Sequence, residues 1–147
     1  MTAPATQSWH RDRYEISTDP TRINRDLTHR FLSEEAYWSP GVARATVEKA
    51  IDNSIVFGIY REQEQVGFAR VVSDYATFAW LCDVFVLPEH RGTGIGKWLM
   101  ECVIAHPELQ GLRRFMLATR DAHGLYAQYG FTPVAVDRFM EKRDQPR

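Results

Sequence analysis

The residues best suited to chemistry form a glycine-rich turn, Arg91-Gly92-Thr93-Gly94-Ile95-Gly96-Lys97. It follows an apolar run that stops at Pro88 and opens a segment whose apolar residues have helical spacing. Because glycines lack a Cβ, their backbone N–H groups can crowd around phosphate oxygens, and the helix N-terminus adds about half a positive charge. Arg91 and Lys97 add cationic side chains. The turn is therefore predicted to bind a pyrophosphate; a tight turn without a ligand is the alternative.

The amino-acid sequence of this turn does not match either of two well-known phosphate-binding motifs. A Walker loop requires Gly-Lys followed by Ser or Thr, but Lys97 precedes Trp98. A dinucleotide fingerprint requires glycine at the last position of G-x-G-x-x-G, where this chain has Lys97 or Leu99, depending on the starting glycine. A nucleotide-phosphate-binding protein of either type is therefore disfavoured.

A second segment with candidate chemistry is Ala122-His123-Gly124-Leu125-Tyr126-Ala127-Gln128-Tyr129-Gly130-Phe131. Together with the pattern Arg91-x-x-Gly94-x-Gly96, it resembles the two signatures of the GNAT acetyltransferase superfamily. Two spaced signatures are more specific than either one, and they cover about residues 80–131. The resemblance implies a small single-domain N-acetyltransferase that transfers the acetyl group of acetyl-CoA to a primary amine.

The resemblance also implies where coenzyme A binds. Its pantetheine arm is expected to pair with the backbone of a strand, and its pyrophosphate to lie on the glycine turn. Where many members of the family have an asparagine, seven residues before the tyrosine, this chain has Thr119, which leaves the details of anchoring open. The implied cofactor-binding residues are Val84, Phe85, Val86, Arg91, Gly92, Thr93, Gly94, Ile95, Gly96, Lys97, Thr119, Ala122 and Tyr126.

Attack of an amine on a thioester makes three demands: a base, a donor for the developing oxyanion and an acid for the leaving thiolate. The resemblance assigns the acid to Tyr126 and the oxyanion donor to a backbone N–H near Val84–Val86. Asp83, on the same strand, is the first candidate for the base. Glu35, Asp74 or a chain of waters are alternatives for this step, and His123 is expected to be solvated.

The resemblance implies that the acceptor binds between the first two helices, the loop that joins them and the hairpin after the third strand. Aromatic side chains gather in these segments and suit a small amine with an apolar body or a cation held over ring faces. Core packing is the alternative for each of them. The candidate acceptor-binding residues are Tyr37, Trp38, Tyr75 and Trp80. A second function class, a non-catalytic acyl-CoA-binding module, predicts binding without turnover.

Net charge, cysteine content and the lengths of the apolar segments argue against several other classes of protein. A net charge of -1 over 147 residues provides no global field for nucleic acid or an anionic membrane. Cys82 and Cys102 have no metal-ligand spacing and are expected to be reduced thiols. No segment has the apolar core of a signal peptide or the roughly 20 apolar residues of a membrane span, so a cytoplasmic location is expected. A homodimer through Phe139-Met140 and the edge strands is the alternative to a monomer.

The pattern of apolar residues predicts an α/β or α+β domain with the order β-α-α-β-β-β-α-β-α-β. We expect a mixed central sheet of six to seven strands with helices on both faces. Residues 1–12 are predicted to be a flexible leader and residues 13–147 a single acetyltransferase domain. The predicted strands are near 14–16, 55–60, 66–72, 78–87, 114–119 and within 131–140; the predicted helices are 20–35, 42–51, 95–106 and 125–129.

Overall fold

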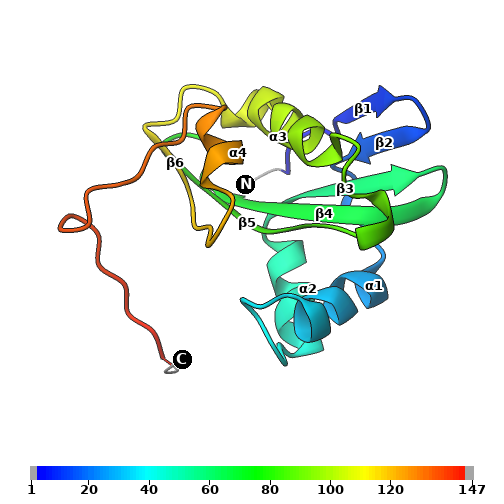
Figure 1. Cartoon of the computed structure of the whole chain (residues 1–147), viewed down its shortest axis with the longest axis horizontal. Coiled ribbons are helices and arrows are strands. Elements are labelled where there is room, and N and C mark those ends of the chain that lie inside the picture. The colour runs from blue at the N-terminus through cyan, green and yellow to red at the C-terminus, as the bar shows by residue number, and fades with distance from the viewer. Residues whose placement is uncertain (1–2, 145–147) are drawn as a thin grey trace.

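Six strands lie in sequence order across one mixed sheet, and the computed structural model describes residues 3–144 (Figure 1). The first five strands pair antiparallel with their neighbours, and the sixth lies parallel to the fifth. This confirms the predicted mixed sheet. The strands are β1 (Ser8–Arg11), β2 (Tyr14–Ser17), β3 (Ile55–Arg61), β4 (Glu64–Ser73), β5 (Phe78–Val86) and β6 (Arg114–Leu117).

Helices cover both faces of the sheet, as predicted (Figure 1). One face carries α1 (Arg25–Arg30), a π-helical turn (Phe31–Glu35) and α2 (Arg44–Asp52), and the opposite face carries α3 (Ile95–Ala105) and α4 (His123–Ala127). Short 3-10 turns at Pro20–Arg22, Pro88–His90 and Pro107–Leu109 connect these elements. Within residues 3–144, none of the helices combines the length and the apolar character needed to cross a bilayer.

The core has two layers because β3 is buried on both faces. Ile55, Phe57 and Ile59 pack in the cluster beneath α3, and Val56 packs in the cluster beneath α1 and α2. Side chains of a strand alternate between faces, so a run of consecutive apolar residues supplies both layers. The continuous run in β3 therefore follows from its central place in the sheet.

A β-bulge in β5 changes which residues face which layer. Ala69 of β4 lies opposite two residues, Asp83 and Val84, and Asp83 adopts a left-handed conformation with φ 56°. Before the bulge, Leu81 packs on the α3 side; after it, Phe85 packs on the α1 side although both numbers are odd. One extra residue reverses the alternation and bends the strand at the point where the site forms.

The predicted first helix is divided into three pieces. Asp19 accepts a hydrogen bond from the Thr21 amide and starts a 3-10 turn only, and the side chain of Asn24 then accepts from the Leu27 amide to begin α1. After Arg30 the chain continues as the π-helical turn to Glu35. The helical spacing was correct, but the second cap at Asn24 was missed.

The predicted flexible leader is wrong for its last part, because Ser8–Arg11 form β1. This strand pairs antiparallel with β2 in the register Ser8↔Ser17 to Arg11↔Tyr14, around a turn in which Asp12 has φ 55°. Trp9 stacks on Phe57, with ring centroids 6.2 Å apart, which anchors the strand to the core. Residues 1–2 of the expected leader and residues 145–147 of the expected domain lie outside the described residues.

The strands predicted within residues 131–140 are also wrong. Residues 131–144 contain no strand, and the segment leaves the body of the molecule beyond α4, where Figure 1 draws it in orange and red. Its alternating apolar pattern is typical of a strand, but the segment has no hydrogen-bonded neighbour in the sheet. A strand needs a partner for its backbone groups, which sequence periodicity alone does not supply.

Candidate active site

A gap opens between β5 and β6 because the two strands pair over only part of their length. The register joins Phe78–Leu81 to Arg114–Leu117, and β5 continues from Cys82 to Val86 without a neighbour on that side among the described residues. The bulge lies at the start of this unpaired stretch. The backbone groups of Val84–Val86 are therefore available to an extended ligand, in the manner of an added strand.

The glycine turn lies at the wide end of this gap and opens α3. Gly92 and Gly94 have φ values of 80° and 81°, a conformation that other residues rarely adopt. The N-terminus of α3 has no side-chain cap among the described residues, whereas Asn24 caps α1. A Cβ built on Gly92 or on Gly96 meets no described atom within 4 Å. Uncapped amides facing open space form a cradle that fits a phosphate.

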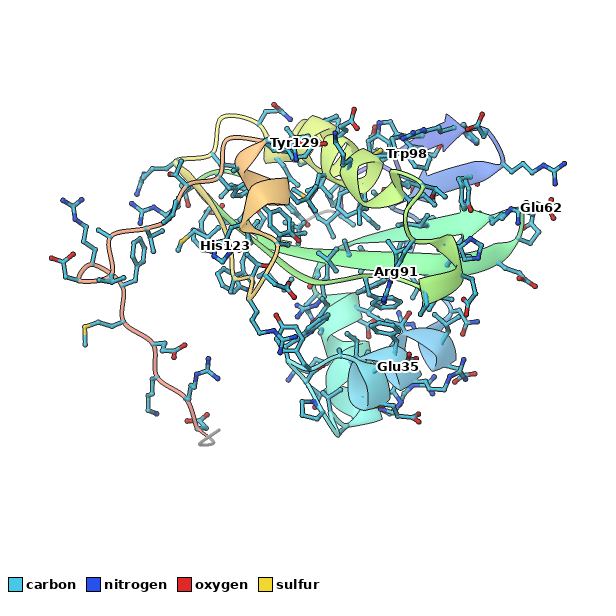
Figure 2. All side chains as sticks on the ribbon, viewed as in Figure 1. Glu35, Glu62, Arg91, Trp98, His123 and Tyr129 are labelled. Atoms are coloured by element: carbon cyan, nitrogen blue, oxygen red, sulfur yellow. The ribbon has the colours of Figure 1, made fainter. Side chains whose placement is uncertain are left out.

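A first groove of about 500 Å³ runs from this cradle along the unpaired end of β5. The opposite wall comes from the π-helical turn and the loop after it, and Figure 2 shows Glu35 and Arg91 on opposite sides of the space. Most predicted cofactor-binding residues line this groove: Val84, Phe85, Val86, Arg91, Gly92, Gly94, Ile95 and Gly96. Their common position supports a single extended binding surface.

Two predicted residues of the turn do not line the groove with their neighbours. The hydroxyl of Thr93 donates to the carbonyl of His90 at 3.2 Å, and the carbonyl of Lys97 accepts from the Tyr129 hydroxyl at 3.1 Å. Both contacts stabilise the local path of the chain. Phe85 lines the groove but its ring is buried against Phe31, with centroids 4.0 Å apart, so its backbone is the part that a ligand can pair with.

A second groove of about 610 Å³ lies on the other side of the bulge, between β5 and the loop that leads into α4. The two grooves share lining residues, so they meet beside the bulge at Val84. The residues common to both grooves are Tyr37, Trp38, Val84, Arg120 and Asp121. The other predicted site residues that line the second groove are Trp80, Asp83, Thr119, Ala122 and Tyr126. The candidate catalytic residues therefore surround one junction.

Tyr126 comes from α4 and lines the second groove, where its half-buried ring packs edge-on against Phe131. Burial, and to a lesser extent the nearby Tyr37, raises the pKa of the Tyr126 hydroxyl. This hydroxyl therefore keeps its proton at neutral pH and is fit to act as an acid. His123, at the start of the same helix, is exposed and lines neither groove (Figure 2).

Asp83 has both carboxylate oxygens engaged by neighbouring side chains. Trp38 Nε1–H donates to Oδ1 at 2.9 Å, and Arg70 Nε–H donates to Oδ2 at 3.0 Å. Arg70 Nη2 lies 2.9 Å from the same oxygen in an ion pair. The guanidinium of Arg70 also donates to the Ser54 hydroxyl at 3.2 Å. Asp83 thus ties β4, β5 and the loop carrying Trp38 together, which the sequence did not show because its partners are far away along the chain.

Asp74 and Tyr75 belong to the β4–β5 turn and line neither groove. The carboxylate of Asp74 accepts from the hydroxyl and amide of Thr77 at 2.6 and 2.8 Å and from the amides of Ala76 and Phe78. These bonds hold its pKa well below the usual range. Tyr75 packs on the core beneath α3. Asp74 therefore organises a turn, and the predicted place of Tyr75 in the acceptor site is not supported.

The structure also places Arg120, which follows Thr119, at the junction of the two grooves. Its guanidinium lies over the ring of Tyr37, 3.8 Å from the centroid. The hydroxyl of Thr119 accepts from the Ala122 amide at 3.0 Å, which shapes the turn that presents both residues. The position of Arg120 next to Thr119 could have indicated a place in the site. Its contact with Tyr37 could not be predicted, because Tyr37 lies in a distant loop.

Cys82 also lines the second groove, yet it is unsuited to be a nucleophile. Burial raises the pKa of its thiol to about 11, so the reactive thiolate is scarce at neutral pH. Cys82 is therefore a poor candidate for a covalent intermediate. Among the described residues, no group of three or more His, Cys, Asp or Glu side chains could hold a metal ion.

Comparison with known proteins identifies this arrangement. The family model of the GNAT acetyltransferase domain matches residues 52–133, which include β3 to β6, the glycine turn and α4. The chain belongs to the GNAT acetyltransferase family. This confirms the resemblance inferred from the two signatures, and with it the assignment as an N-acetyltransferase.

Members of the family resemble the chain along most of its length. A candidate acetyltransferase of Gibberella zeae is 37% identical over 144 residues, covering 83% of this chain and 80% of its own. The crystal structure of a GNAT-family protein of Xanthomonas campestris pv. campestris is 51% identical with a TM-score of 0.85, covering 99% and 96%. An acetyltransferase of Clostridium acetobutylicum, crystallised with acetyl-CoA, shares the fold at 15% identity, with a TM-score of 0.66 and 88% and 94% covered.

Proposed function

We propose that this GNAT acetyltransferase binds acetyl-CoA in the first groove and transfers the acetyl group to a primary amine held in the second. The observation that carries the proposal is the junction of the two grooves at Val84 and Trp38, with Tyr126 beside it. An extended donor and a compact acceptor reach each other only where their grooves meet. Proximity of this kind accounts for a large part of the acceleration of a two-substrate reaction.

The residues of the first groove fit coenzyme A. The amides of the glycine turn and the first turn of α3 hold the pyrophosphate, and the backbone of Val84–Val86 pairs with the pantetheine arm. Arg91 Nε–H now donates to the carbonyl of Val86 at 2.8 Å, so binding replaces this bond and frees the guanidinium for a phosphate. When bound, acetyl-CoA supplies an acetyl group activated as a thioester.

Three groups of the chain serve the transfer of the acetyl group from sulfur to nitrogen. A backbone N–H at the bulge near Val84 donates to the carbonyl oxygen as negative charge develops on it. Tyr126 gives its proton to the sulfur as the carbon–sulfur bond breaks. Glu35, exposed on the wall of the first groove, accepts the proton of the amine through a water. Asp83 acts through its ion pair, because its oxygens already accept from Trp38 and Arg70.

The second groove favours an acceptor with a flat or cationic apolar body. Trp38, Trp80 and Tyr37 supply aromatic walls, and Tyr37 already holds the guanidinium of Arg120 over its ring. An acceptor with a similar cation can take the same kind of position over a ring face. The acceptor proposed is therefore a small-molecule or peptide amine of this chemistry.

Calorimetric titration of the purified chain with acetyl-CoA tests the first step, with ATP and NADH as controls. Binding of acetyl-CoA at micromolar concentration, without binding of the controls, supports the proposal. A screen of amines that follows release of the CoA thiol then tests transfer. Binding without release for any amine would favour the non-catalytic acyl-CoA-binding module, and absence of binding would refute the proposal.

A further inference from the structure

The strand β1, at the end of the predicted leader, directs one of its faces at α3. Trp9 and Arg11 are two residues apart, so their side chains share a face of the strand. Trp9 stacks on Phe57, which belongs to the cluster beneath α3. Arg11 is directed to the same side, and its Cζ lies 5.9 Å from the ring centroid of Trp98, in the first turn of α3 (Figure 2).

The guanidinium of Arg11 also lies against the glycine turn. Its Nη2 is 3.4 Å from the position that a Cβ on Gly94 would take. Gly94 lines the first groove and directly precedes α3. Arg11 itself does not belong to the lining of that groove, so its side chain stands at the rim of the phosphate cradle. A ligand that fills the cradle comes within reach of this side chain.

The positive charge of Arg11 is not matched by an acidic neighbour. Within residues 3–144, its guanidinium has no ion pair and no hydrogen bond, and it contacts only the aromatic ring and the glycine turn. Two nearby arginines are paired: Arg13 lies 4.0 Å from Glu62, and Arg22 lies 2.9 Å from Glu15. The register of β1 and β2 places Glu15 on the face of the hairpin opposite to that of Arg11. The cation at the rim is therefore available to an anionic ligand.

A second contact holds the β1–β2 hairpin against the same turn. Tyr14 lies directly opposite Arg11 in the register of the two strands, so both side chains are on one face. The Tyr14 hydroxyl is 2.9 Å from Nδ1 of His90, which lines the first groove just before the glycine turn. The hairpin thus contacts the cradle at His90 and at Gly94, and it positions Arg11 before a ligand arrives. Such preorganisation lowers the entropic cost of binding.

We propose that Arg11 is a further cofactor-binding residue, which donates hydrogen bonds to a phosphate of coenzyme A at the glycine turn. Its guanidinium supplies a full positive charge beside the amides of α3, which supply only a partial one. β1 is then a functional element of the cofactor site. This inference rests on the proposed binding of acetyl-CoA in the first groove. Coenzyme A carries a pyrophosphate and a ribose 3′-phosphate, and dephospho-CoA, which lacks the second, distinguishes them.

Calorimetric titration of Arg11→Met with CoA tests the inference. Methionine keeps an unbranched apolar side chain over Trp98 and removes the charge and the donors. The dissociation constant for CoA is expected to rise about tenfold. The difference from wild type should shrink as salt is added, because salt screens exposed charges. Arg13→Met is the matched control: it removes an exposed arginine of the same hairpin, which pairs with Glu62, and should stay within about twofold of wild type.

Further titrations identify the phosphate and separate this inference from the proposed function. An equal loss of affinity for CoA and dephospho-CoA assigns Arg11 to the pyrophosphate, and a loss confined to CoA assigns it to the 3′-phosphate. Arg11→Lys keeps the charge and should recover part of the affinity. Wild-type affinity in Arg11→Met, an equal loss in Arg13→Met, or no recovery in Arg11→Lys would overturn the role of Arg11 alone. A wild-type chain that binds neither CoA nor acetyl-CoA would instead refute the proposed function itself.

Discussion

The two sides of the sheet differ in how completely their strands are paired. On the β1–β4 side every strand is antiparallel to its neighbour, and β3 buries six of its seven residues. On the β5–β6 side the strands pair over four residues and then diverge, and β6 has no fully buried residue. The complete side supplies the core, whereas the incomplete side leaves backbone groups free for ligands. Unused pairing capacity is what marks the functional side.

Removing the hydroxyl of Tyr126 is expected to have the largest effect on the incomplete side. Tyr126→Phe should lower kcat by about 10²- to 10⁴-fold, because the leaving thiolate loses its acid. The affinity for acetyl-CoA should not change. Since the pKa of this hydroxyl is raised, wild-type activity that depends on its proton should persist through neutral pH and fall only as the pH rises through that raised value.

The matched control is Tyr129→Phe, in the same segment. Its hydroxyl donates to the Lys97 carbonyl and lines neither transfer groove, so kcat should stay within about twofold of wild type. Steady-state kinetics by thiol release, together with calorimetric affinity for acetyl-CoA, measures both variants. Equal rates for Tyr126→Phe and wild type would remove the acid from the mechanism.

Filling the phosphate cradle is expected to weaken cofactor binding by about 100-fold, or roughly 2.7 kcal/mol. Gly96→Val places a branched side chain in the open space in front of α3 without meeting described atoms at its Cβ. Gly124→Val is the control, because Gly124 has the same second position in α4 and the same open surroundings. Calorimetry should show a loss of affinity for Gly96→Val only; equal losses would mean that the cradle does not hold the phosphates.

Breaking the ion pair of Asp83 and Arg70 tests how much more a partly buried pair at the site stabilises the fold than an exposed pair does. Asp83→Asn leaves Arg70 without its charged partner and should lower the free energy of unfolding by about 2 kcal/mol, less than for a fully buried pair. The side chains keep 15% and 18% exposure. Asp26→Asn removes an exposed ion pair with Arg44 and should change the free energy of unfolding by at most about 0.5 kcal/mol. Urea unfolding measures both variants. If Asp83→Asn lowered the free energy of unfolding no more than Asp26→Asn, Asp83 would not be holding β4, β5 and the Trp38 loop together.

The smallest effect is expected at the β4–β5 turn. Asp74→Ala should lower the urea midpoint at neutral pH, because Asp74 holds the turn through its carboxylate. The pKa of Asp74 is depressed in the folded state, so this contribution is complete above the ordinary value of 3.8 and is lost as the pH falls towards the folded value. The difference from wild type should therefore narrow below about pH 3.8. Glu34→Ala, which removes an exposed carboxylate outside this turn, is the control for the loss of a surface charge.

Features that depend on near neighbours in the chain were predicted well. The glycine turn, the helix from Ile95 and the hairpin of β3 and β4 follow from residue types a few positions apart, and the structure has each of them. Tyr126, which belongs to the second signature, lines the second groove. Local conformational preference and hydrophobic periodicity act over such distances, which is why sequence patterns report them.

Features that depend on distant partners were decided by the tertiary structure. The ion pair of Asp83 requires Arg70 on β4 and Trp38 in a remote loop, and the stacking of Arg120 requires Tyr37. Pairing also decided that residues 8–11 form β1 while residues 132–140 form no strand, although both segments are short and amphipathic. A strand exists only where a neighbour accepts its backbone hydrogen bonds, and that neighbour is selected by the fold and not by the segment itself.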